Sequence, residues 1–447
     1  MNCFRGFFGQ VIRWLVTAVS LGAVGTVYAQ ANEQYFPIVA FRTGPVVALS
    51  TSLLGGFIDY LDLLNKRDGG INGVKLAWEE CETEYKVDRG IECYERLKNK
   101  GPGGAPLFLP VITGIIYTAI ERSRADKIPI VSIGTGRTDS ADGRVFPYIF
   151  ALATHYWNGS TAKIRFIGQR EGGMDKLKGK KIVNLYHGSA YGKETIPVLD
   201  AQAKKYGFEI VHIEVTPPGA EQQSQWLQIR RLNPDWVILR SAGIMTPAAL
   251  KSAQRVGYPV DRIIGVWWAG SEEDVIPAGD AAKGFITNTI NPSGQDFPVI
   301  REILTHLYGG GKRGNMEDPK RVGSSVYNAG VLHAILTTEA VRTAQEKFGK
   351  KAMDREQVRW GLEHLNIDEA RLKKLGAGGL LQPVKTSCSN HEGGGAVKFQ
   401  QWDGQKWVVI SDWVPGDEAM VRPMIEESAA KYAKEKGIAP RDCSKES

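Results

Sequence analysis

Residues 50–66 read STSLLGGFIDYLDLLNK, and apolar side chains recur in this segment at i, i+3 and i+4. This spacing predicts an amphipathic helix, and the serine and threonine residues at its start are available as caps. Apolar, strand-like segments precede and follow it at residues 35–42 and 74–81. A strand, a helix and a second strand in this order indicate parallel strands with the helix packed on one face of their sheet.

The same alternation continues to residue 268 and falls into two series. In the first series we expect helices at 88–99 and 115–125 and strands at 107–110 and 128–133. In the second series, which follows a strand at 148–152, we expect helices at 156–170, 191–206, 220–232 and 247–256 and strands at 181–187, 208–215, 236–240 and 262–268. The predicted fold class is therefore α/β, with two such units in succession.

The last third of the chain contributes fewer elements. We expect a strand at 285–289 and helices at 322–344 and 355–365. Apolar and polar residues alternate at 396–402 and 406–413, on either side of Asp403-Gly404, and Asp-Gly between two such runs predicts a β-hairpin. After Pro415 the chain is charged, and we expect a helix there.

The composition is that of a soluble globular protein. Of the 447 residues, 43% are hydrophobic and 23% are charged, which excludes a polytopic membrane protein and a disordered chain. The formal net charge is +7, but both signs are interspersed, as in residues 426–436. A solvated surface explains this mixture better than a nucleic-acid site does, because phosphate neutralisation requires clustered Lys and Arg side chains.

The N-terminus has the order of a secretory signal. Arg5 and Arg13 are its only charged residues, residues 14–24 are apolar, and Ala29 ends a small-residue cleavage pattern. A membrane anchor would need about twenty apolar residues, and this run is roughly half as long. We therefore expect an exported protein that loses residues 1–29.

The cysteines support export. Cys3 leaves with the signal, so Cys81, Cys93, Cys388 and Cys443 remain. An even number of cysteines in an exported chain predicts disulfides, and four cysteines allow three pairings. Cys81 with Cys93 is favoured, because the end of a strand and the start of the next helix can bring two Cα atoms within reach. Cys388 with Cys443 would then fix the C-terminal tail.

Motifs of the common enzyme classes are missing from the sequence. There is no HExxH, no GxSxG and no phosphate-binding loop, and no GxGxxG follows the first strand of either unit. The seven histidines show no metal-ligand spacing, and there is no CxxC pair. We expect no metal, no cofactor and no catalytic residue. The alternative is a secreted α/β enzyme that uses Ser189 or His187.

Small and polar residues gather where predicted strands end. In parallel sheets ligands bind outside the carboxyl ends of strands, where the free N–H groups of helix starts can hold an anion. Ordinary turns have the same composition, so the hypothesis depends on the number of such places. The candidate ligand-binding residues at these ends are Arg42, Thr43, Thr113, Gly114, Gly134, Thr135, Gly136, Tyr191, Gly243, Trp267 and Trp268.

Trp267-Trp268 is the most informative of these pairs. One indole can belong to the core while the other forms an aromatic wall of a ligand cleft, or both can be packing residues.

Residues 68–76 (DGGINGVKL), 128–132 (IPIVS), 191–192 (YG), 282–284 (AKG) and 326–329 (VYNA) carry a family resemblance. In their order and spacing they resemble the type I periplasmic solute-binding proteins of ABC transporters, in the branched-chain amino acid and amide branch. The similarity spans about residues 33–413. The last of these segments adds Tyr327 to the candidate ligand-binding residues.

The resemblance implies two Rossmann-like lobes with parallel sheets, joined by hinge strands, that close on a small solute and present it to a membrane permease. Lobe 1 would comprise residues 30–152 and about 285–385, lobe 2 residues 153–284 and about 386–414, and residues 415–447 would be a C-terminal extension. We expect a monomer in the periplasm without a nucleic-acid partner. A ligand-sensing receptor domain stays open as an alternative.

The resemblance also implies how a ligand would be held. In relatives, groups at the positions of Thr113-Gly114 and of residues 134–136 take the ligand carboxylate, and an acidic residue near the position of Trp267-Trp268 often holds an ammonium group. This chain has tryptophan there, and Glu272 and Glu273 follow a few residues later. We expect a carboxylate-bearing ligand, either an amino acid, an amide or an aromatic carboxylate, and the tryptophans favour the aromatic carboxylate.

Overall fold

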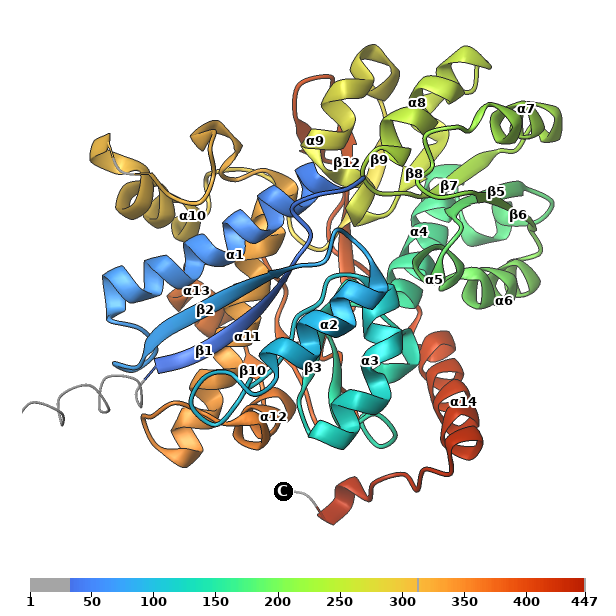
Figure 1. Ribbon diagram of the computed structural model, residues 1–447. Coiled ribbons are helices and arrows are strands. Elements are labelled where there is room, and N and C mark those ends of the chain that lie inside the picture. The colour runs from blue at the N-terminus through green and yellow to red at the C-terminus, as the bar shows by residue number, and fades with distance from the viewer. Residues whose placement is uncertain (1–32, 312, 446–447) are drawn as a thin grey trace, which may run out of the picture.

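The computed structural model describes residues 33–311 and 313–445, which form two α/β lobes (Figure 1). The expected signal of residues 1–29 lies outside the described residues.

The first lobe is built on two pairs of parallel strands. β1 (Glu33–Ala40) pairs with β2 (Lys75–Glu82), and β3 (Ile130–Ile133) pairs with β4 (Ile149–Leu152). Instead of the predicted strand at 107–110, a single bridge joins Phe108 to Ile130. The helices of this lobe are α1 (Val47–Asp68), α2 (Val87–Leu97), α3 (Thr113–Asp126), α10 (Pro298–Ile303), α11 (Ser325–Phe348), α12 (Arg355–Glu363) and α13 (Glu369–Lys374), with a short antiparallel pair β10 (Asn366–Ile367) and β11 (Val384–Lys385).

Helix α1 is the predicted amphipathic helix, and it forms the core of the first lobe together with α11. It is long and apolar enough to span a membrane, but most of it is buried within the protein. The two helices approach each other closely at two glycines. A Cβ atom on Gly56 would lie 2.1 Å from the backbone carbonyl oxygen of Tyr327, and a Cβ atom on Gly330 would lie 1.9 Å from that of Leu53. Any larger residue at these positions would separate the helices.

The second lobe contains a single large sheet. Its strands lie in the order β13, β12, β9, β8, β7, β5, β6, and the run from β9 to β6 is parallel. The strands are β5 (Lys181–His187), β6 (Glu209–Val215), β7 (Trp236–Arg240), β8 (Ile263–Gly265), β9 (Ile286–Thr289), β12 (Ala396–Trp402) and β13 (Trp407–Val409), with β14 (Val414–Pro415) paired to β12. The helices are α4 (Tyr156–Glu171), α5 (Ala190–Lys193), α6 (Ile196–Tyr206), α7 (Gln223–Leu232), α8 (Met245–Arg255) and α9 (Glu272–Val275).

The predicted hairpin is confirmed. Strands β12 and β13 pair in an antiparallel direction with Trp402 opposite Trp407, and the Asp403 N–H donates to the Lys406 oxygen over 3.1 Å. The segment before β12 instead bonds to the first lobe, since the Ala153 N–H donates to the Glu392 oxygen over 2.9 Å. The chain therefore passes between the lobes after β4, after β9 and again before β12.

Residues 415–445 form what we call the C-terminal strap, whose helix α14 (Glu418–Lys436) runs from the second lobe along the edge of the first (Figure 1). At its start, the Asp417 carboxylate accepts from Lys205 Nζ over 2.7 Å, and the Asp417 N–H donates to Thr161 Oγ1 over 2.9 Å. Farther along the helix, Ser428 Oγ donates to Asp139 Oδ2 of the first lobe over 2.7 Å. The strap therefore touches both lobes.

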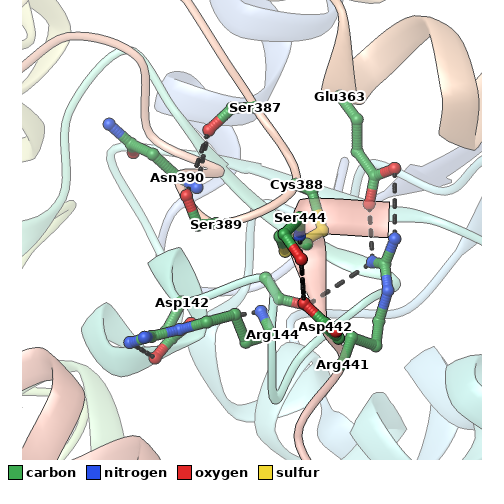
Figure 2. Close-up of a disulfide and its surroundings, with 12 residues drawn as sticks. Asp142, Arg144, Glu363, Ser387, Cys388, Ser389, Asn390, Arg441, Asp442 and Ser444 are labelled. Carbon is green, nitrogen blue, oxygen red and sulfur yellow. Dashed lines mark hydrogen bonds and ion pairs between the residues drawn. A yellow bond between two sulfur atoms is a disulfide. The ribbon is translucent and has the colours of Figure 1, made fainter. Parts of the chain in front are cut away.

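Both favoured disulfides are present, Cys81–Cys93 with a Cα–Cα distance of 5.6 Å and Cys388–Cys443 with 5.7 Å. The second ties the end of the strap to the first lobe. Figure 2 shows Arg441 next to this disulfide with its guanidinium directed at Glu363, and Arg441 Nη1 lies 2.7 Å from Glu363 Oε1. Glu363 is buried, and hydrogen bonds and charge from its partners lower the pKa of its carboxyl to about 2 despite that burial.

Candidate functional site

A small cavity of about 30 Å³ lies between the two lobes, which is room for about one water molecule. The first lobe provides side chains from the end of β1, the start of α1, the turn after β2 and the start of α3, and the second lobe provides side chains that follow β4, β5, β7 and β8. All come from the region beyond the carboxyl ends of strands, as expected for this architecture. The lining residues are Phe41, Val46, Leu49, Tyr85, Val111, Thr113, Tyr156, Tyr191, Ala242 and Trp268.

The two tryptophans bridge the lobes. Both indole N–H groups donate to the Gly134 carbonyl oxygen, over 2.8 Å from Trp267 and 2.9 Å from Trp268. Each tryptophan is only 5% exposed, and of the two only Trp268 lines the cavity. Trp267 stacks on Tyr156 with ring centroids 5.5 Å apart. One tryptophan therefore faces the cavity, and the other packs behind it.

The loop at residues 134–136 is held against the start of α3. Thr113 is the first residue of α3 and is buried, and its Oγ1 accepts a hydrogen bond of 3.3 Å from the Gly136 N–H. Gly134 has a φ of +61°, and a Cβ there would lie 2.8 Å from Trp267 Nε1, so the turn requires glycine. Thr135 is buried and accepts from Ser132 Oγ through its carbonyl. The structure thus brings the predicted residues of this loop together with Thr113-Gly114.

Gly243 forms a second contact between the lobes. Its φ is +58°, and a Cβ atom on it would lie 2.4 Å from the carbonyl oxygen of Pro45 in the first lobe. The Gly243 N–H donates to Asp274 Oδ2 over 2.8 Å. Burial raises the pKa of this carboxyl to about 7. The lobes can meet here only because no side chain intervenes.

Tyr191 lines the cavity and contacts a buried arginine, Arg240, which ends a strand but is not among the candidate ligand-binding residues. The Arg240 guanidinium contacts two rings, 4.2 Å from the Tyr156 centroid and 4.6 Å from the Tyr191 centroid. It also donates to the Tyr191 carbonyl oxygen. The Tyr191 hydroxyl donates to the backbone carbonyl oxygen of Ser241 over 3.0 Å.

Of the candidate residues only Thr113, Tyr191 and Trp268 line the cavity, and three of the others are held by partners within the protein. Arg42 pairs with Glu80 at 2.6 Å, and Thr43 Oγ1 donates to Glu82 Oε1 over 2.9 Å. These carboxylates come from β2, which runs parallel to β1 with Ala40 beside Glu82. Tyr327 is buried on α11 and donates to Asp59 Oδ2 over 2.7 Å. Local partners therefore occupy the polar groups that the sequence analysis assigned to a ligand.

Glu272 and Glu273 also have partners within the protein. Glu272 accepts from the Ser325 N–H over 2.9 Å, and Glu273 pairs with Arg321 at 2.6 Å. Burial, followed by the neighbouring charge of Glu273, raises the pKa of Glu272 to about 8. Neither residue lines the cavity, and the lining set contains no carboxylate. The described cavity therefore has no counter-charge for an ammonium group.

Several cavity residues escaped the sequence analysis. Phe41 and Tyr85 are large apolar side chains just after strands, and Leu49 and Tyr156 are at helix starts. Small and polar residues at strand ends indicate anion sites, and among aromatic residues only Tyr191, Trp267 and Trp268 are predicted there. The signal that would have found Tyr156 is its position directly after the strand that ends the first series.

His187 and Ser189 lie close together, with Nδ1 and Oγ 2.8 Å apart. Burial lowers the pKa of His187. The nearby Glu214 carboxylate instead binds the Tyr186 hydroxyl at 3.2 Å and Lys193 Nζ at 3.2 Å. Among the described residues, no third group is hydrogen-bonded to His187 to orient it as in a hydrolase. Among residues 33–311 and 313–445, no cluster of three His, Cys, Asp or Glu side chains is placed to hold a metal ion.

The sequence profile of the Periplasmic binding protein family matches residues 33–406. A solved structure from the Pseudomonas fluorescens group, described as an ABC transporter permease, is 50% identical, with 92% of this chain and 99% of that chain covered and a TM-score of 0.86. No curated protein matches the chain.

More distant solved structures share the fold. A branched-chain amino acid ABC transporter protein from Thermus thermophilus with bound valine is 22% identical, covers 88% of this chain and 99% of its own, and has a TM-score of 0.73. A solute-binding protein of an ABC transporter from R. palustris in complex with benzoate is 18% identical. It covers 86% of this chain and 97% of its own, and its TM-score is 0.66. The chain belongs to the periplasmic binding protein family.

Proposed function

We propose that this substrate-binding protein captures a small solute with an apolar or aromatic body between its lobes. The observation that supports this proposal is the lining of the cavity, to which both lobes contribute aromatic residues and Thr113 adds a hydroxyl group. A ligand that touches both lobes stabilises the closed form, because only a solute with differential affinity for that form shifts the equilibrium. Two of the distant relatives are described with valine and with benzoate bound.

The proposal includes the place of the protein in transport. After export and removal of residues 1–29, the protein acts in the periplasm as a monomer and delivers its solute to the permease of an ABC importer. The division into lobes is part of the same proposal, with crossings a few residues from those expected from the sequence. We set them after β9, because β9 pairs with β8, and after Glu392, because that residue bonds to Ala153.

Members of this family bind solutes without transforming them, and the hydrogen-bonded pair His187 and Ser189 is the one observation that favours an enzyme. The enzyme hypothesis and the binding-protein hypothesis predict different outcomes of one experiment. A hydrolase would release product from an ester or amide substrate, and Ser189→Ala would abolish that release. A binding protein would return its ligand unchanged, and the same substitution would leave affinity within about twofold.

The experiment that tests the proposal is a thermal-shift and calorimetric screen of the purified, oxidised protein. The panel contains benzoate, 4-hydroxybenzoate, phenylacetate, hexanoate, benzamide, hexanamide, valine and leucine. We expect one chemical class to raise the melting temperature in a concentration-dependent way. A panel without a single binder would overturn the proposal.

A further inference from the structure

The buried guanidinium of Arg240 has no carboxylate partner among the described residues. The side chain is 1% exposed, and it contacts the Tyr191 carbonyl oxygen and the rings of Tyr156 and Tyr191. Its Nε is buried without a hydrogen-bond partner. A buried cation is costly unless a counter-charge compensates it, so an uncompensated one marks a place where an anion is stabilised.

The charge lies directly behind the cavity wall. Tyr156 and Tyr191 line the cavity, and the rings of both contact the guanidinium, so the cation lies next to residues that form the cavity wall. Asp274 of α9, a buried acidic residue of the same lobe, accepts from the Gly243 N–H instead. Positive charge in this low-dielectric region therefore acts on whatever occupies the cavity.

A second buried amine, Lys163 on α4, belongs to the same neighbourhood. It is 1% exposed, and burial followed by repulsion from Arg240 lowers the pKa of its ammonium group well below its usual value. A lysine can lose its proton in such a place, whereas an arginine keeps its charge. Lys163 is thus the matched control for Arg240, being a buried basic residue near it that need not carry charge.

We propose that Arg240 is the specificity-determining residue of the cleft and that the solute is a monocarboxylate without an ammonium group. This inference rests on the proposed function and names the substrate class. The cation favours an anion over a neutral isostere, and the absence of a lining carboxylate disfavours a zwitterion. An amino acid carries both charges, so the same site holds it less tightly than the deaminated acid of equal size.

The test compares isosteric pairs that differ in charge alone, which are benzoate with benzamide and hexanoate with hexanamide. Valine is compared with 3-methylbutanoate for the effect of the ammonium group. In the unmodified protein we expect the carboxylate to bind at least tenfold more tightly than its amide. Equal affinity for the two members of a pair, or a preference for valine, would overturn the assignment even though binding itself, and with it the proposed function, stood.

Three variants locate the effect. Arg240→Met should reduce the carboxylate-to-amide affinity ratio at least tenfold, Arg240→Lys should retain part of it, and Lys163→Met should leave it within about twofold. An unchanged ratio in folded Arg240→Met protein, judged by circular dichroism and melting, would refute the role of Arg240. Should Arg240→Met fail to fold, the ratio in Arg240→Lys and in the unmodified protein decides the question.

Discussion

The indole N–H of Trp267, in the second lobe, donates a hydrogen bond of 2.8 Å to the carbonyl oxygen of Gly134, in the first. The bond joins residues 133 positions apart in the chain and is buried. Since it links the lobes, it exists only while they are closed. Its free energy therefore adds to ligand affinity and not to the stability of either lobe alone.

Trp267→Phe removes this N–H but keeps an aromatic ring against Tyr156. A buried hydrogen bond contributes about 1 kcal/mol, so we expect the Kd of the tightest-binding solute to rise about three- to tenfold. The control is Trp236→Phe, which removes a 2.9 Å bond from Trp236 Nε1 to Glu171 within the second lobe. It should lower the free energy of unfolding without changing the Kd, as measured by calorimetry. Equal effects of both variants on affinity would contradict the prediction.

Gly243→Ala tests whether the close approach to Pro45 is required for closure. Alanine at a φ of +58° costs about 1 kcal/mol of stability, and its Cβ would also lie 2.4 Å from the Pro45 oxygen. We expect ligand affinity to fall more than tenfold. Gly257→Ala is the matched control, because Gly257 has a φ of +74° with nothing within 4 Å. Both variants should lose similar stability, and a similar loss of affinity in both would show that strain rather than lobe contact is responsible.

Thr113→Ala removes the cavity hydroxyl at the start of α3. If the hydroxyl donates to a ligand carboxylate, affinity should fall by about 1–3 kcal/mol, the contribution of a charge-assisted hydrogen bond. Thr118→Ala, on the same helix, removes an exposed hydroxyl that donates to the Gly114 oxygen over 2.8 Å. Calorimetry should show a changed Kd for the first variant alone. An unaltered Kd in Thr113→Ala would remove Thr113 from the site.

Asp274→Asn should change how stability depends on pH. The pKa of Asp274 is raised by burial from 3.8 to about 7, so the folded state keeps a proton that the unfolded state releases. The contribution of this protonated carboxyl to the free energy of unfolding is complete below about pH 4 and is lost as the pH rises toward 7. Between pH 5 and pH 8, the free energy of unfolding should therefore fall by roughly 2 kcal/mol more in the unmodified protein than in the variant. Parallel pH profiles in urea titrations would contradict this.

The two disulfides should contribute unequally to stability. They span 12 and 55 residues, and the entropy of closing loops of this size predicts about 3 and about 4 kcal/mol respectively. We expect the paired replacement of Cys388 and Cys443 by serine to cost more in urea unfolding than the paired replacement of Cys81 and Cys93. The opposite order would show that the contacts of the strap do not depend on the Cys388–Cys443 disulfide at its end.

Much of the fold follows from local sequence. Short apolar runs and helical periods predict the strands and helices of both lobes because these elements bury their apolar faces wherever they pack. The Asp403-Gly404 hairpin follows from turn chemistry alone. One exception is the segment at 107–110, where a single bridge between Phe108 and Ile130 replaces the expected strand. Its apolar residues are buried as expected, so burial did not require a strand.

The site was harder to predict because its polar partners come from distant segments. Arg42 resembles an anion ligand until β2 is placed beside β1, where Glu80 neutralises it. Tyr327 matches a family motif, yet Asp59 of α1 takes its hydroxyl. Conversely, Arg240 ends a buried strand like any core residue, and only its lack of a carboxylate partner distinguishes it. Such partnerships depend on strand register and lobe packing, which no local pattern encodes.

The C-terminal strap makes part of the hinge a covalent ring. The chain from Cys388 to Cys443 includes the passage between lobes that precedes β12, and it includes α14, which is bonded to both lobes. A closed ring cannot lengthen, so the lobes separate only as far as its segments can rearrange. Protein produced in a reducing compartment has this ring open. Dissociation constants measured on such material and on exported protein would therefore describe two different hinges.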